Sequence, residues 1–400
     1  MKNNTINNLL LTLTFLLPSC ITEEVPDNTP QGNFEALWKI IDTKYCFLDY
    51  KNKEYGLDWN EIHRRYQNRL TDDMTNKQLF QVLAEMLNEL RDGHVNLMTY
   101  HETSQYREWY DQYPTNFVDT IQRIYLGKDY KTIGGIKYQI LEDNIGYIYY
   151  GSFSNAIGES NLDEVLNELS ICDGLILDIR NNGGGSVSNI NALGSRFTNE
   201  SKVLTGYDLH KTGKGHNDFG DTIAVYLTAP SSKVIQAENQ ETENTENLNG
   251  QKVRFTKDVV LLTNRSVFSA ANDFVRIMKV LDNVTVIGDH SGGGGAVPVS
   301  FNLPNGWSVR LSTTPSLDIN FEHTEMGIEP DIKIDMAPDA EMTGRDAILD
   351  KAIEHGKEKR KPYRGAKAID PHCRNHGNCP WCQRKVKYKD KKRRMNREID

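Results

Sequence analysis

The sequence predicts a mixed α/β protein with a helical region near its N-terminal end. Residues 33–97 place Phe34, Leu37 and Ile41 at helical spacing, whereas from residue 138 onward short strand-like apolar runs alternate with helical segments. Strand, turn and helix repeated in this order are typical of an α/β core. With 38% apolar residues in a chain of 400, there is enough material for about two domains.

The helical region contains recognisable helix starts. Asp58 stands just before an apolar-periodic stretch, and Thr75 with Gln78 has the form of a capping box. The apolar face continues through Leu83 and Leu87. We therefore expect a helical domain over residues 33–97, followed by a connecting segment over residues 98–137.

The core domain is expected over residues 138–337, with a C-terminal helix over residues 338–355. Residues 216–257 are mostly polar and are predicted to run over the surface. The expected strands are 145–150, 174–179, 259–263 and 284–287, and the expected helices are 161–169, 190–197 and 270–281.

The first twenty residues read as a targeting signal. Lys2 precedes an apolar run over Leu9–Leu17, which is too short to span a bilayer that needs about 20 residues. The end of this run, Leu17-Pro18-Ser19-Cys20, resembles a bacterial lipobox, in which the cysteine is acylated. We expect a lipoprotein signal peptide (1–20), a linker (21–32) and a lipid-anchored protein of the cell envelope, in the periplasm or outer membrane. An ordinary cleaved secretion signal is the alternative.

The last segment of the chain has a different composition from the rest. Residues 356–400 hold 16 Lys and Arg against 5 Asp and Glu, a net charge of +11. The whole chain carries −8, so residues 1–355 carry −8 − 11 = −19. We predict a disordered basic tail that is solvated rather than bound to nucleic acid. Cys373, His376, Cys379 and Cys382 leave a disulfide or a zinc site as alternatives.

Three loops carry residues suited to catalysis, and the first is a glycine run. Residues 181–185, Asn-Asn-Gly-Gly-Gly, follow a buried strand and precede a helix. Backbone N–H groups exposed there could hold an oxyanion, assisted by the helix dipole. A structural tight turn is the alternative, and the spacing does not match a nucleotide-phosphate loop.

The other two loops hold Ser269 and His94. Ser269 ends the loop between the strand over residues 259–263 and the following helix. At this helix N-terminus it could be a nucleophile or a plain helix N-cap. His94 follows the helical region in Asp92-Gly93-His94-Val95 and could be a general base or a structural residue.

Taken in order, four motifs resemble one family of enzymes. They are Asp92-Gly93-His94, Asp178–Gly185, Arg265–Asn272 and Gly327–Ile332. Together they resemble the tail-specific, or C-terminal-processing, serine proteases. The resemblance covers residues 34–335 and implies a crotonase/ClpP-like spiral of ββα units, an N-terminal helical bundle, and a peptide or protein substrate.

Two departures indicate which branch of the family the chain is similar to. Many members have a lysine in a turn where this chain has Gly294, and the stretch between His94 and Ile145 is too short for the PDZ domain common in the family. The pattern resembles the tricorn-like branch, which implies Ser269 as nucleophile, His94 as base and Glu325 as orienting acid. Tricorn-type sites have a serine where this chain has Gly93.

The resemblance also suggests how the reaction proceeds. The oxyanion is expected on the N–H groups of Ala270 and either Gly183 or Gly184, and the chemistry requires no metal or organic cofactor. One rival is a catalytically inactive envelope protein that binds peptides or ligands with the same fold. A second rival, an acyl-CoA enzyme, is disfavoured by export, because CoA is a cytoplasmic substrate.

Overall fold

The computed structural model describes residues 27–108, 116–198, 200–229 and 252–360, and it confirms the mixed α/β class. The helices are α1 (Pro30–Lys44), α2 (Leu48–Tyr55), α3 (Trp59–Gln67), α4 (Asn76–Asn88), α6 (Asp119–Leu126), α7 (Glu159–Glu168), α8 (Val187–Gly194), α9 (Ala270–Lys279), α10 (Ala340–Thr343) and α11 (Ala347–Arg360). The strands are β1 (Asn96–Met98), β2 (Lys131–Ile133), β3 (Ile136–Leu141), β4 (Ile145–Tyr150), β5 (Gly174–Asp178), β6 (Lys202–Lys211), β7 (Phe219–Thr228), β8 (Val259–Thr263), β9 (Val284–Gly288), β10 (Ala296–Asn302), β11 (Ser308–Leu317) and β12 (Ile332–Lys333).

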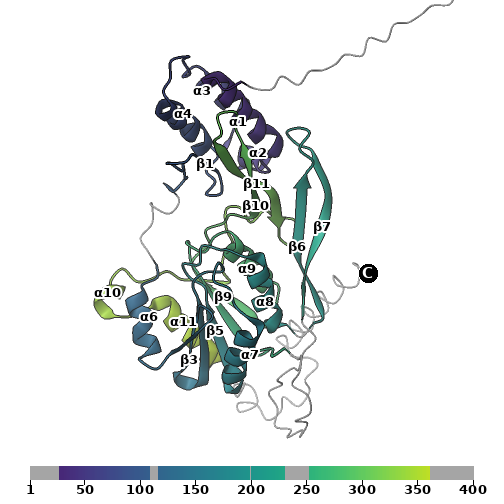
Figure 1. Cartoon of the computed structure of the whole chain (residues 1–400). Coiled ribbons are helices and arrows are strands. Elements are labelled where there is room, and N and C mark those ends of the chain that lie inside the picture. The colour runs from purple at the N-terminus through teal and green to yellow at the C-terminus, as the bar shows by residue number, and fades with distance from the viewer. Residues whose placement is uncertain (1–26, 109–115, 199, 230–251, 361–400) are drawn as a thin grey trace, which may run out of the picture.

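The larger sheet has seven strands in the order β12-β9-β8-β5-β4-β3-β2, parallel from β12 to β4 and antiparallel at β3 and β2. Its strands are apolar on both faces because helices cover both faces. In β5, Leu175 and Leu177 pack in the core shared with α7, α8 and α9, whereas Ile176 packs with α6 and α11 (Figure 1). The carboxyl ends of parallel strands share one edge, so the loops that follow β5 and β8 come together.

Helices α3 and α4 begin where the sequence indicated, and together with α1 and α2 they form the helical region. The Asp58 side chain accepts a hydrogen bond from the Glu61 N–H, and Thr75 with Gln78 forms both bonds of a capping box. The helices lie beside the β10–β11 hairpin (Figure 1), and their core includes Leu311 of β11. The helical region and this hairpin therefore fold as one packed unit.

The polar segment 216–257 contains a strand that the sequence did not indicate. Its described residues were expected on the surface and are mostly exposed there, but they include β7, which pairs with β6 in a long antiparallel hairpin (Figure 1). Strand β7 is mostly exposed along its length, so it lacks the buried alternation that marks a strand in sequence. Its stability comes from cross-strand pairing instead.

Some expected boundaries differ in the structure, and other expected features lie outside the described residues. Helix α11 continues to Arg360, past the boundary expected at residue 355, and the segment 98–137 contains α6 and β2. Cys20 and the cysteine- and histidine-containing tail lie outside the described residues. Among the residues that are described, no helix combines the length and apolarity needed to cross a membrane.

Leu311→Ala should destabilise the protein strongly because Leu311 is fully buried between β11 and the helices. Removing a buried leucine side chain costs about 2–5 kcal/mol of unfolding free energy. Val299→Ala on β10 is the matched control, since Val299 is 44% exposed, and it should cost less than about 1 kcal/mol. Urea unfolding measures both, and equal losses would contradict a core shared by the helices and the hairpin.

Candidate active site

The glycine loop after β5 is anchored by buried polar contacts. Arg180 is fully buried and pairs with Asp178 at 2.7 Å and with Asp346 at 2.8 Å. Two residues further along the loop, the Asn182 Oδ1 accepts a hydrogen bond from the Gly184 N–H at 2.9 Å. Gly184 has φ +97°, and a Cβ there would lie 2.7 Å from the Phe268 carbonyl oxygen. Only glycine allows this loop to approach the chain next to Ser269 so closely.

Ser269 stands in the loop after β8 with a backbone conformation that is rare for a residue with a side chain. Its φ is +57° and its ψ −127°, and its N–H donates to the Gly293 carbonyl at 2.9 Å. Within the described chain its hydroxyl makes no capping bond to α9. The Ser269 Oγ lies 2.9 Å from the His94 Nε2 instead. Strained backbone of this kind occurs often at active sites.

His94 lies between α4 and β1, held by its own loop. Its backbone N–H donates to the Asp92 Oδ1 at 2.7 Å, and its ring packs on Phe268 with a centroid distance of 4.7 Å. Burial lowers the pKa of His94 to about 4, and the nearby Asp92 charge opposes this. The imidazole is therefore neutral at pH 7 and able to accept a proton from Ser269. Among the described residues its Nδ1 has no hydrogen-bond partner.

Backbone donors flank Ser269. Ala270 is the first residue of α9, where a helix leaves its N–H groups without an intrahelical acceptor. Of the two glycines proposed from sequence, Gly184 donates its N–H to Asn182, whereas the Gly183 N–H has no partner within the described chain. Gly183 is thus the glycine whose donor is available to a ligand.

Glu325 does not contact His94 directly. Its Oε1 lies 3.0 Å from the Lys51 Nζ and its Oε2 accepts the Gly295 N–H at 3.2 Å; no hydrogen bond joins it to His94 in the described structure. Burial raises the pKa of Glu325 to about 8, Asp92 adds to the rise, and Lys51 opposes it. Sequence reasoning assigned no role to Lys51, because nothing in the polar helix α2 distinguishes it.

Two family models match separate parts of the chain. The model of peptidase family S41 matches residues 144–334, and that of the tricorn protease C1 domain matches residues 26–88. The solved structure of a candidate peptidase from Parabacteroides merdae ATCC 43184 is 43% identical, covers 86% of this chain and 100% of its own, and has a TM-score of 0.74. The chain belongs to peptidase family S41.

More distant S41 relatives agree on the fold or the family. The carboxy-terminal processing protease CtpA of Bacillus subtilis (strain 168) is 25% identical over 220 residues, which is 54% of this chain and 40% of CtpA. The chain spans about two fifths of the length of the curated relatives it matches. Mature CPAF has a similar fold, with a TM-score of 0.61 at 13% identity over 84% of this chain and 98% of CPAF.

The Phe268 ring accounts for both glycine departures in this S41 chain. A Cβ on Gly294 would lie 2.5 Å from the ring, and a Cβ on Gly93 would lie 3.1 Å from it. The ring thus fills the space that a Cβ at position 294 would need, and it would make a tight contact with a Cβ at position 93. A cavity of about 180 Å³ adjoins it, lined by Arg91, Gly93, Tyr106, Phe268, Gly292, Gly294, Glu325 and Met326.

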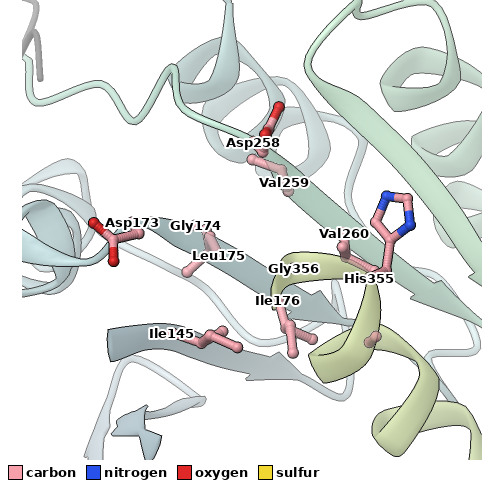
Figure 2. Close-up of a pocket in the computed structure, with 11 residues that line it drawn as sticks. Ile145, Asp173, Gly174, Leu175, Ile176, Asp258, Val259, Val260, His355 and Gly356 are labelled. Carbon is pink, nitrogen blue, oxygen red and sulfur yellow. The ribbon is translucent and has the colours of Figure 1, made fainter. Parts of the chain in front are cut away.

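Another cavity lies at the far edge of the large sheet (Figure 2). Ile145, Gly174 and Val259, the first residues of β4, β5 and β8, line it together with His355 of α11. Because these strands are parallel, this edge is opposite the loops that carry Gly183 and Ser269. Its volume of about 20 Å³ holds about one water molecule, so it cannot hold a peptide.

Glu325→Gln should change how the stability of the protein depends on pH. A carboxyl whose pKa rises on folding binds a proton more tightly in the folded state, so its contribution is lost as pH increases from about 4.5 to about 8. Each pH unit in this window costs up to about 1.4 kcal/mol. The free energy of unfolding of Glu325→Gln, measured with urea at pH 5 and pH 8, should therefore fall less than that of the wild type. Parallel pH dependences would contradict the raised pKa.

Proposed function

We propose that this S41 peptidase is a serine peptidase in which Ser269 attacks the peptide carbonyl and His94 is the general base. The observation that carries the proposal is the 2.9 Å contact between the Ser269 Oγ and the His94 Nε2. His94 takes the hydroxyl proton as the acyl-enzyme bond forms and returns it to the leaving amine, and water then hydrolyses the ester.

The oxyanion is proposed to bind the N–H groups of Ala270 and Gly183. Both belong to the loops that flank Ser269, and the N-terminal end of α9 adds a favourable dipole. A preformed donor of this kind is worth about 3–4 kcal/mol of transition-state stabilisation. Glu325 would act on His94 indirectly, through the hydrogen bond that it accepts from Lys51.

The proposed substrates are peptides or unstructured C-terminal segments of proteins. The names of the curated relatives, which are C-terminal processing proteases, support this substrate class. The proposal includes a crotonase/ClpP-like spiral behind a helical N-terminal domain, which is supported by the repeated strand–helix order of the large sheet.

Covalent labelling tests the nucleophile. A fluorophosphonate should label the wild type, Ser269→Ala should abolish the label, and His94→Ala should slow labelling by roughly 100-fold or more, since it removes the base. The exposed His101→Ala is the matched control and should label at the wild-type rate. Labelling that persists in Ser269→Ala would disprove the assignment, and so would wild-type labelling rates in His94→Ala.

We further propose that the chain is an envelope lipoprotein acylated at Cys20, on the strength of the lipobox-like end of its first apolar run. Full-length protein from bacterial membranes should partition into the detergent phase, because acyl chains anchor proteins to lipid. Cys20→Ala should move the protein to the aqueous phase. Detergent-phase partition of Cys20→Ala would contradict acylation at this residue.

A further inference from the structure

Three ionisable side chains from separate segments meet in the interior beside His94. They are Lys51 of α2, Asp92 of the loop after α4, and Glu325 of the loop before β12, with exposed fractions of 0%, 1% and 6%. The mechanism above gives no direct task to Lys51 or Asp92. Buried charges are costly unless they are paired, so a cluster of three needs an explanation.

Asp92 has polar partners on both of its carboxylate oxygens. Its Oδ1 accepts the His94 backbone N–H at 2.7 Å, and its Oδ2 accepts the Tyr45 and Ser312 hydroxyls, each at 2.9 Å. The Lys51 Nζ lies 3.9 Å from the same Oδ2. Polar groups from the α1–α2 connection, α2 and β11 thus surround a single carboxylate two residues before the proposed base.

We propose that Asp92 is the positioning carboxylate of this site: it fixes the His94 loop and stabilises the imidazolium that forms when Ser269 attacks. The Lys51 ammonium group offsets the cost of burying the Asp92 and Glu325 carboxyl groups close together. This inference rests on the proposed function, because it assigns a task within that mechanism.

The charge states favour Asp92 over Glu325 for this task. Although burial opposes it, Lys51 and His94 hold the pKa of Asp92 below its usual range, so this carboxyl is ionised at neutral pH. Glu325 is largely protonated at the same pH, because its pKa is about 8. The titratable or charged groups that face Asp92 and His94 are Tyr45, Cys46, Lys51, Tyr55, Arg310 and Glu325.

Lys51 ties the cluster to the backbone of the His94 loop. Its Nζ donates to the Leu90 carbonyl at 2.7 Å and to the Arg91 carbonyl at 3.3 Å, in addition to its bond with Glu325. Leu90 and Arg91 directly precede Asp92. The ammonium group therefore restrains the loop at its start, and Asp92 restrains it at His94.

The test compares Asp92→Asn with Glu325→Gln in the full chain. Asparagine keeps an oxygen for the His94 N–H but removes the charge, so kcat for a peptide substrate should fall roughly 100-fold with KM nearly unchanged. Glu325→Gln should lose less than roughly tenfold, because its carboxyl is already mostly protonated. Thermal unfolding and near-ultraviolet circular dichroism establish that both variants are folded.

The pH profile separates a positioning role from a packing role. In the wild type, kcat/KM should fall only near the His94 pKa of about 4. Asp92 raises that pKa, so Asp92→Asn should move the acidic limb to lower pH. If Asp92 mattered only for packing, water admitted to the ring would move the limb up toward about 6.5.

The outcomes are distinct for the two proposals. Wild-type kcat in Asp92→Asn, an upward shift of its acidic limb, or an equal loss in Glu325→Gln would each overturn the role of Asp92 and leave Ser269 and His94 in place. Fluorophosphonate labelling that does not depend on Ser269 would overturn the proposed function itself.

Discussion

The packing of helices α1 to α4 against strand β11 is the constraint on which the candidate site depends. Ser269 and Gly183 are brought together by the parallel sheet, since both follow the carboxyl ends of neighbouring strands. His94 comes from outside that sheet. It reaches Ser269, at 2.9 Å, because β1 pairs with β11 and because Leu311 and its neighbours bury the helices against the hairpin. A site divided between two packing units is complete only when both units are folded and joined.

One aromatic ring lies against both glycines that distinguish this chain from the sites it resembles. Phe268 precedes Ser269, packs on the His94 ring, and lies against Gly93 and Gly294. The same ring helps to bury His94, and burial is what lowers the pKa of the imidazole. Aromatic packing by Phe268 therefore contributes to both the position and the burial of the His94 ring.

The buried charges beside His94 show how such a site is held in position. Removing a single member of a buried ionic cluster is costly because it leaves the others uncompensated. The Lys51 ammonium lies between the Asp92 carboxylate and the Glu325 carboxyl group, and the loop backbone also holds it. The arrangement links α2, the His94 loop and the Glu325 loop, three segments far apart in sequence, through contacts of defined geometry rather than through apolar packing alone.

The sequence by itself determined the elements whose signals are local. Strands β4, β5, β8 and β9 are continuous apolar runs, the Thr75 capping box is a spacing pattern, and the glycine and serine loops follow those strands directly. The β10–β11 hairpin also has a local signal, because Asn305-Gly306 forms its turn with Gly306 at φ +83°, but its strands were not predicted. Only the tertiary structure decided the pairing of exposed β7 with β6, the availability of the Gly183 N–H rather than that of Gly184, and the hydrogen bond between Lys51 and Glu325. These depend on distances between residues remote in sequence, and no periodicity or motif encodes such distances.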